Sequence, residues 1–298
     1  SPYVDESNFA LGEFYFEKER WKDAQGYYSK VAQNKRGRLF SFALYKSAWC
    51  LYKTGQVKDG LAALERVIRT GRAAKGSKDD SAGGVSRIRL ATEAMKDLVV
   101  FYAEVGTAKS ARNYFEKVAG EKNAFNLVEK LAYYFSDNGN RDGAKYLFEE
   151  MIDLKPNAPK AYDYQYQIVS MYAASGNNQV FKEELYQWIS TYGPDSAWYQ
   201  VNQANKDLVA KASQLIETTL RNYILQQHQT AQNSHANYSQ QLAKSGYELY
   251  FNTFKDSPKL DEMHFFFAEL LFDMKDYERA AYHYTWVGEN AQKSKYFE

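Results

Sequence analysis

The stretch SPYVDESNFALGEFYFEKERWKDAQGYYSKVAQN, residues 1–34, has a counterpart near the other end of the chain: SPKLDEMHFFFAELLFDMKDYERAAYHYTWVGEN, residues 257–290. The two stretches align without a gap. About a third of their positions are identical, and most of the others exchange one apolar residue for another. Distant segments match this well when they form the same structural unit, so the sequence predicts an internal repeat with a period in the mid-thirties.

Each copy reads as two helices joined by a short polar turn. In the first copy, Gly12 is the small residue at which a neighbouring helix can approach closely, and Tyr15 follows on the same face. The second helix places Ala24 where the two helices cross, and Tyr28 and Val31 continue that face at spacings of four and three. This is the periodicity of an amphipathic helix. The copy at residues 257–290 keeps the same order of small, bulky and apolar residues.

The same order recurs through the interior of the chain. It is found at Ala48, Leu51, Gly60, Leu64 and Val67; at Val99, Tyr102, Ala111, Phe115 and Val118; at Ala132, Phe135, Ala144, Phe148 and Met151; at Val169, Tyr172, Phe181 and Leu185; and at Ala243, Tyr247 and Tyr250. These residues resemble the tetratricopeptide repeat, a helix-turn-helix of about 34 residues, over about nine tenths of the chain. The resemblance implies an all-α fold, a right-handed α-solenoid of tetratricopeptide-type helix pairs.

The repeats divide the chain into segments. We expect units one and two in residues 1–74, a flexible loop rich in Gly, Ser, Lys and Asp in residues 75–86, and units three to five in residues 87–194. Residues 195–298 are expected to hold long helices and units six and seven, because the Gln- and Asn-rich stretch from Ser196 to about Gln232 lacks Gly and Pro. We also expect the array to continue beyond both ends of the sequence.

Composition disfavours several functions. The net charge is +1, so no overall field would attract nucleic acid. The apolar stretches are short and interrupted, which predicts no membrane span. The one cysteine, Cys50, stands in the apolar run SAWCLY and is expected to be a buried structural thiol.

No catalytic or metal-binding constellation stands out. His228 and His235 lie seven apart without a cysteine or carboxylate at ligand spacing, so we interpret them as surface or groove residues. NGNRDGAKYLFE, residues 138–149, fits a calcium-loop pattern. However, its first ligand is Asn138 instead of Asp, and the repeat register starts a helix near Arg141. We therefore predict no enzyme activity, no metal and no cofactor.

The first helix of each pair lines the concave side of such an array. The family register then predicts a partner-binding groove, to which the third unit adds Lys96, Val100 and Glu104. Its main candidate residues are Phe9, Glu13, Phe16, Tyr45, Trp49, Tyr52, Lys53 and Tyr133. Tyr45, Trp49 and Tyr52 share one helix face, and exposed aromatic residues beside charges are typical of protein-binding hot spots. The other interpretation is that several of these aromatic side chains pack between repeats.

One subclass of the family clamps a carboxylate terminus with Lys and Asn. Phe9 and Glu13 stand at two of those positions here, which disfavours that ligand. The phrase F-x-D-S-P, followed by Asp-Glu and aromatic-x-x-Ala, resembles bacterial envelope repeat proteins. Examples are the lipoprotein of the barrel-assembly machinery, the TolA-binding protein and gliding-motility repeat proteins.

These observations favour a non-catalytic scaffold or adaptor that binds a protein or peptide in a multiprotein assembly. The resemblance to envelope proteins implies a periplasmic location in a Gram-negative envelope, with the cytoplasm as the alternative. Three other functions stay open: self-association, a regulatory module whose flanking sequence carries the activity, and a glycan hydrolase. The last of these needs two positioned carboxylates in a cleft.

Overall fold

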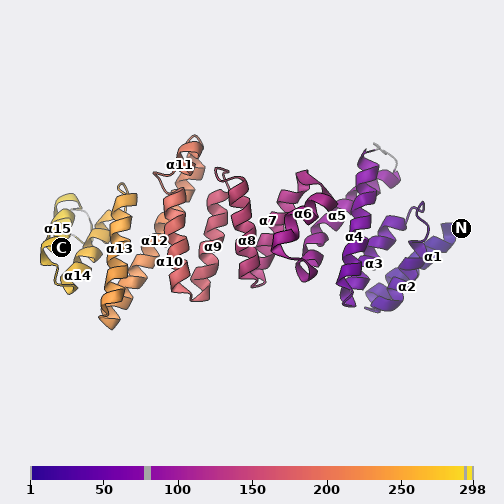
Figure 1. The fold of residues 1–298 in the computed structure, drawn as a ribbon, viewed down its shortest axis with the longest axis horizontal. Coiled ribbons are helices and arrows are strands. Elements are labelled where there is room, and N and C mark those ends of the chain that lie inside the picture. The colour runs from indigo at the N-terminus through magenta and orange to yellow at the C-terminus, as the bar shows by residue number, and fades with distance from the viewer. Residues whose placement is uncertain (1, 77–81, 292–293, 297–298) are drawn as a thin grey trace. The chain divides into compact units, whose positions relative to one another are not determined.

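The computed structural model describes residues 2–76, 82–291 and 294–296. These residues form fifteen helices joined by short turns, and no strand occurs among them (Figure 1). The chain divides into two compact units, Ser1–Leu154 and Lys155–Glu298. The predicted all-α class is confirmed.

The first compact unit is an array of antiparallel helix pairs. Its helices are α1 (Pro2–Glu17), α2 (Trp21–Val31), α3 (Phe40–Lys53), α4 (Val57–Gly76), α5 (Ala82–Val105), α6 (Ala108–Ala119), α7 (Glu121–Asp137) and α8 (Arg141–Leu154). Consecutive helices pack against one another, α5 and α6 through the rings of Tyr102, Tyr114 and Phe115. Helix α5 also contacts α3 and α7, the first helices of the neighbouring pairs. The first helices therefore form one layer of this unit.

The second compact unit follows the same plan with two departures. Its helices are α9 (Ala161–Ser175), α10 (Asn178–Tyr192), α11 (Ala197–Asn202), α12 (Lys206–Ser234), α13 (Asn237–Thr253), α14 (Leu260–Asp273) and α15 (Tyr277–Asn290). The departures are the short α11 and the 29-residue α12. Of the two helices in the stretch after Ser196, α12 is longer than the helices of the standard unit, whereas α11 is shorter.

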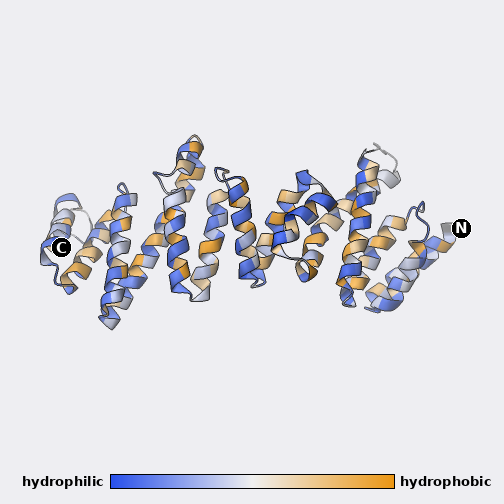
Figure 2. Ribbon diagram, in the orientation of Figure 1, coloured by the Kyte–Doolittle hydropathy of each residue, from blue (hydrophilic) through white to orange (hydrophobic). Residues whose placement is uncertain are grey.

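The helices are amphipathic. Figure 2 shows hydrophobic and hydrophilic residues side by side on most of them. In α4, Leu64, Val67 and Ile68 are fully buried, whereas Lys58 and Arg66 on the opposite face are exposed. No helix within the described residues has both the length and the apolar composition needed to cross a membrane.

The turn inside the helix pair has the same backbone conformation in five of the pairs. Seven positions after the residue at the helix crossing, which is small in four of the pairs and Val169 in the fifth, the chain adopts a positive φ angle. The residues concerned are Glu19, Gly55, Gly139, Gly176 and Lys275, with φ angles of 55°, 79°, 79°, 74° and 64°. A residue in this left-handed region ends the first helix and reverses the chain. The repeat inferred from side chains is therefore matched by a repeat in the backbone.

The loop expected at residues 75–86 is helical at both of its ends. Helix α4 extends to Gly76 and α5 begins at Ala82, so both helices enter the loop expected at residues 75–86, of which residues 77–81 lie outside the described residues. The first compact unit ends at Leu154. Helix α8 stops there because Pro156 follows, and the residue before a proline avoids the helical conformation.

Gly71 explains the extension of α4 and gives a testable prediction. A β-carbon at Gly71 would lie 2.3 Å from Cβ of Ala91 and 2.7 Å from the carbonyl oxygen of Arg87, so α4 and α5 approach too closely for any side chain. We expect Gly71→Ala to lower the free energy of unfolding by about 1–2 kcal/mol. Overpacking of about 1–3 kcal/mol outweighs a helix-propensity gain of about 1 kcal/mol.

The matched control is Gly26→Ala in α2. Gly26 is exposed, and a β-carbon there meets no atom within 4 Å. This substitution should raise the free energy of unfolding by about 0.5–1 kcal/mol, because only the helix propensity changes. Urea denaturation followed by circular dichroism measures both effects. A stabilising Gly71→Ala would show that α4 and α5 are not in close contact there.

Candidate protein-binding face

The eight residues predicted for the groove all lie on first helices of the first compact unit. Helix α1 carries Phe9, Glu13 and Phe16; α3 carries Tyr45, Trp49, Tyr52 and Lys53; α7 carries Tyr133. Lys53 is exposed, and the other seven are half-buried. These side chains therefore combine contacts inside the protein with a surface that a partner can reach.

The aromatic row of α3 is anchored on α5. The hydroxyl of Tyr45 donates a hydrogen bond of 2.6 Å to Oδ2 of Asp97, and Nε1 of Trp49 donates to the same oxygen at 3.1 Å. The hydroxyl of Tyr52 lies 3.4 Å from Oε1 of Glu104. The Trp49 and Tyr52 rings also pack on Phe101, with centroid distances of 5.2 and 4.5 Å. Two carboxylates and one ring of α5 thus hold the three aromatic side chains in fixed orientations.

These phenols are held in their neutral, hydrogen-donating form. Burial raises the pKa of Tyr45 to about 12, and the hydrogen bond to Asp97 adds to the increase. The pKa of Tyr52 is also raised, first by burial and then by the charge of Glu104. Each phenol therefore stays protonated throughout the physiological range and donates its O–H to the carboxylate it contacts.

A second polar contact joins α1 to α3. Nζ of Lys46 lies 3.0 Å from Oε2 of Glu13 and 4.5 Å from the centroid of the Phe16 ring. The hydroxyl of Tyr28, on α2, donates to Oε1 of Glu13. Glu13 therefore binds a lysine from the next repeat and a tyrosine from its own.

The structure brings the predicted residues together in two groups. Phe9, Glu13 and Phe16 gather around Tyr28. In the second group, Trp49 and Tyr52 pack on Phe101, and Tyr45 shares Asp97 with Trp49. Tyr133 packs its ring edge-to-face on Phe148 of α8, at 5.2 Å, and Lys53 ends α3 in solvent.

Sequence reasoning missed Lys46, Asp97 and Phe101. Of the third-unit residues taken from the family register, Glu104 contacts the aromatic row, whereas Lys96 pairs with Glu93 of its own helix. Asp97, Phe101 and Glu104 lie at spacings of four and three. That periodicity in the sequence could have identified the face of α5 that meets α3.

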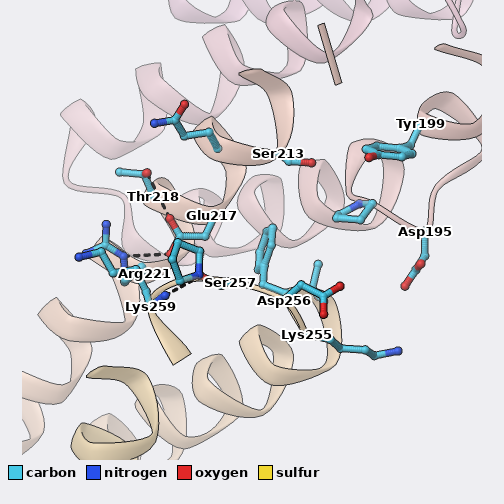
Figure 3. A pocket seen from close by; sticks show the side chains of 15 residues that line it. Asp195, Tyr199, Ser213, Glu217, Thr218, Arg221, Lys255, Asp256, Ser257 and Lys259 are labelled. Carbon is cyan, nitrogen blue, oxygen red and sulfur yellow. Dashed lines mark hydrogen bonds and ion pairs between the residues drawn. The ribbon is translucent and has the colours of Figure 1, made fainter. Parts of the chain in front are cut away.

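A separate hollow of about 580 Å³ lies within the second unit, between α12 and the turn that precedes α14. Figure 3 shows Glu217, Thr218 and Arg221 gathered beside Ser257 and Lys259. Nε of Arg221 lies 3.0 Å from Oε1 of Glu217, which also accepts a hydrogen bond of 2.6 Å from the hydroxyl of Tyr250. The charged side chains of Glu217 and Arg221 at this end of the hollow therefore already interact with each other within the protein.

The residues weighed for metal binding have structural roles. Oδ1 of Asn140 accepts a hydrogen bond from the amide of Gly143 at 3.1 Å, so the calcium-like segment caps the start of α8. Within the described residues, no group of three or more His, Cys, Asp or Glu side chains could hold a metal ion. Cys50 is fully buried, as expected, and burial raises its pKa to about 12.

The interpretation of His228 as a surface or groove residue is wrong. Its side chain is buried in the second unit, and Nδ1 lies 2.8 Å from the hydroxyl of Tyr247. His264 and His283 are buried as well, with their Nδ1 atoms 2.7 Å apart, and the His264 ring stacks on Trp286 at 3.8 Å. His235, exposed, ends α12 with a positive φ angle. Three of the four histidines are thus core residues of the second unit.

Comparison with known proteins identifies the repeat. Residues 42–70, which span most of α3 and α4, match the family model of the tetratricopeptide repeat. No curated protein matches the sequence.

Solved structures similar to this chain include the crystal structure of MamA protein, with 15% identity over 68% of this chain and 96% of that chain and a TM-score of 0.35. A tetratricopeptide repeat protein from Parabacteroides merdae is 11% identical over 98% of this chain and 96% of that chain, with a TM-score of 0.35. The apo form of the quorum sensor NprR from B. thuringiensis is 13% identical over 96% of this chain and 76% of that chain, with a TM-score of 0.34.

Proposed function

We propose that this tetratricopeptide-repeat protein is a non-catalytic scaffold or adaptor that binds another protein through the first helices of its N-terminal unit. The aromatic row of Tyr45, Trp49 and Tyr52 carries the proposal. These side chains are half-exposed, share one face of α3, and are held in place by Asp97 and Glu104. A rigid aromatic surface contributes contact area to a complex with little loss of side-chain entropy.

The neighbouring charges suggest the chemistry of the partner. Glu104 and Lys53 are exposed beside the row, while the aromatic rings offer apolar contact area and π faces. A peptide with apolar anchors flanked by hydrogen-bond donors or a basic side chain suits this surface. A helix or an extended segment can present such anchors, and the groove of a repeat array accepts either.

We place the assembly in the envelope of a Gram-negative bacterium, in the periplasm. The support is the sequence phrase F-x-D-S-P at residues 254–258 with the Asp-Glu pair that follows it, which resembles periplasmic repeat proteins.

The experiment compares the parent chain with a Tyr45→Ala/Trp49→Ala/Tyr52→Ala variant in affinity capture from an envelope extract, followed by titration of the captured protein. We expect the variant to bind that protein at least tenfold more weakly, because loss of a central hot spot costs about 2 kcal/mol or more. Circular dichroism establishes that the variant is folded.

The matched control is Tyr114→Ala. Tyr114 is half-buried like Tyr45, and its hydroxyl donates to Oε1 of Glu65 at 2.8 Å. It lies on α6, a second helix, so its loss should leave binding unchanged. Equal binding by the parent and the folded triple variant would exclude the α3 face as the binding surface.

Self-association is the second candidate function, because α1 exposes a stripe of large apolar side chains. Its members are Tyr3, Val4, Leu11 and Phe14, which are 78%, 55%, 42% and 53% exposed. Exposed apolar patches of this kind mark protein contacts. Sedimentation of the parent and a Leu11→Ser/Phe14→Ser variant separates this function from the first, since neither residue belongs to the aromatic row.

A further inference from the structure

A hollow of about 420 Å³ lies in the first unit between α4 and α6, the second helices of consecutive pairs. We call it the α4–α6 hollow. The pairs α1–α2 and α7–α8 precede and follow it in the chain, so it belongs to the interior of the unit. Three of its lining side chains are cationic and one is a carboxylate. The lining consists of Glu65, Arg69, Arg72, Ala73, Lys117 and Val118.

The guanidinium group of Arg72 is fixed at one wall of the hollow. Its Nη1 donates a hydrogen bond of 2.8 Å to the carbonyl oxygen of Val118, near the end of α6. Its Nη2 would lie 3.1 Å from a β-carbon at Gly120, the residue before α7. The side chain therefore crosses from α4 to the junction of α6 and α7, and its positive charge stays beside the hollow.

The positive charges of the hollow are not neutralised by ion pairs. Among the residues that the structure describes, no carboxylate forms an ion pair with Arg69, Arg72 or Lys117. Glu65 is the one carboxylate of the lining, and its Oε1 already accepts a hydrogen bond of 2.8 Å from the hydroxyl of Tyr114. Three cations and one carboxylate give the lining a formal net charge of +2.

The next junction between second helices has a different balance of charge. Between α6 and α8, Nε of Arg112 lies 2.9 Å from Oε1 of Glu116, and its Nη1 lies 4.0 Å from Oε1 of Glu150. One cation there has two carboxylates within reach, whereas the three cations of the α4–α6 hollow share one. A hollow lined mainly by one sign of charge concentrates its electric field and attracts ligands of the opposite sign.

We propose that the α4–α6 hollow binds an acidic segment of a partner protein, with a side-chain carboxylate placed between Arg69, Arg72 and Lys117. Guanidinium groups bind carboxylates through paired, charge-assisted hydrogen bonds, and a lysine adds a further donor. A hollow of this volume holds more than one side chain, so a short segment fits it better than a free ion. Because Glu65 faces the same space, a singly charged carboxylate is favoured over a doubly charged phosphate.

The hollow is separate from the binding modes considered for the first helices. It uses no residue of the aromatic row on α3. It also differs from a clamp for a terminal carboxylate, whose positions are occupied by Phe9 and Glu13 on α1. The inference therefore goes beyond the proposed binding face and can be tested independently of it.

The test uses the full chain and a rhodamine-labelled peptide that carries a run of glutamates, with a glutamine peptide as the uncharged control. Fluorescence anisotropy in about 0.1 M salt measures both affinities for the parent and for an Arg69→Gln/Lys117→Gln variant. Arg72 is left unchanged because its hydrogen bond to Val118 joins two helices. We expect the double variant to bind the glutamate peptide about tenfold more weakly, the effect of losing charge-assisted hydrogen bonds.

The matched control is Lys58→Gln/Lys109→Gln, which removes two positive charges from exposed positions on the same two helices. Lys58 lies eleven residues before Arg69, and Lys109 lies eight residues before Lys117. At the rise of an α-helix these separations are about 16 and 12 Å, which exceed the screening length of about 10 Å in 0.1 M salt. The control should therefore change the affinity less than about twofold.

A Glu65→Gln variant tests the site in the opposite direction. Glutamine keeps an acceptor for the hydroxyl of Tyr114 but removes the negative charge from the lining. We expect it to bind the glutamate peptide roughly two- to fivefold more tightly, because a like charge beside the ligand is lost. A damaged fold would weaken binding, so tighter binding separates an electrostatic effect from a loss of structure.

Four results would overturn the proposal. The first is the absence of saturable binding to the parent, and the second is equal affinity of the glutamate and glutamine peptides. The third is an equal loss of affinity in the double variant and in its matched control, which would reduce the hollow to part of a general positive surface. The fourth is displacement of the peptide by inorganic phosphate at the ionic strength of a chloride reference, which would make a phosphate group the occupant.

Discussion

Lowering the pH from 7 to 5 should destabilise the second compact unit by about 4 kcal/mol and leave the first unit nearly unchanged. Burial lowers the pKa of His264 to about 3 and that of His283 to about 4, and each is lowered further by a neighbouring group, His283 and Arg279 respectively. An unfolded histidine has a pKa of about 6.5. In the unfolded chain these two histidines therefore bind protons near pH 6.5, whereas in the folded unit they bind them only at about pH 4 and below.

The direction and size of the effect follow from proton linkage. Because the unfolded state binds more protons in this window, the free energy of unfolding falls as the pH falls from about 6.5 toward 4. Each histidine contributes up to about 1.4 kcal/mol per pH unit, and two contribute about 4 kcal/mol between pH 7 and pH 5. His228, whose pKa is also lowered by burial, acts in the same direction.

The first unit is an internal control, because all four histidines lie in the second. Hydrogen exchange of the full chain, corrected for the pH dependence of the intrinsic rate, reports the opening free energy of each unit separately. A His264→Phe/His283→Phe variant keeps two aromatic rings in the core and should lose most of the pH dependence. A fall of the same size in that variant, or in the first unit, would contradict this account.

The helix pairs were predictable from sequence because their packing depends on residue size at fixed positions. The small residues Gly12, Ala48 and Ala132 stand where helices cross, and each is followed seven positions later by the turn that ends the helix. A small side chain at a crossing is required by the geometry of the two backbones, whatever surrounds them. Because each repeat has this requirement, small residues recur in the sequence at the spacing of the repeat, and this spacing can be recognised without a structure.

The length of α4 was not predictable by the same reasoning. Residues 71–76, GRAAKG, contain two glycines and suggest a loop by composition. The helix continues because Gly71 packs closely against Ala91 and Arg87 of α5, and this close packing of two backbones overrides the low helix propensity of glycine. The cause lies in a neighbouring helix, so no local window of the sequence contains it.

The contacts of the aromatic row were anticipated only in part, for a related reason. The repeat register placed the aromatic row on the face of α3 that contacts α5. On α5 it included Glu104 but missed Asp97 and Phe101. Helix α5 has 24 residues, and its length hides where the repeat begins. The buried hydrogen bond of 2.7 Å between Gln165 and Glu184, and the paired histidines, join residues of adjacent helices in ways that polarity alone does not indicate.

Replacing Trp188 by alanine should lower the free energy of unfolding of the second unit by about 3–5 kcal/mol, the usual effect of deleting a large buried aromatic side chain. Trp188 is fully buried on α10, its ring packs on Tyr166 at 5.1 Å, and Nε1 donates a hydrogen bond of 2.8 Å to the carbonyl oxygen of Tyr162. The side chain thus fixes α10 against the first turn of α9. Hydrogen exchange in residues 155–291 measures the loss.

Two further variants separate packing from hydrogen bonding. Trp188→Phe keeps a ring in the core but lacks the indole N–H, so it should lower the free energy of unfolding by about 1–2 kcal/mol. Tyr282→Ala removes an aromatic side chain that is 63% exposed, and its effect should stay within about 0.5 kcal/mol. If Trp188→Ala cost no more than Tyr282→Ala, the indole could not be part of a packed core. If Trp188→Phe cost as much as Trp188→Ala, the hydrogen bond to Tyr162, and not the volume of the ring, would hold α9 and α10 together.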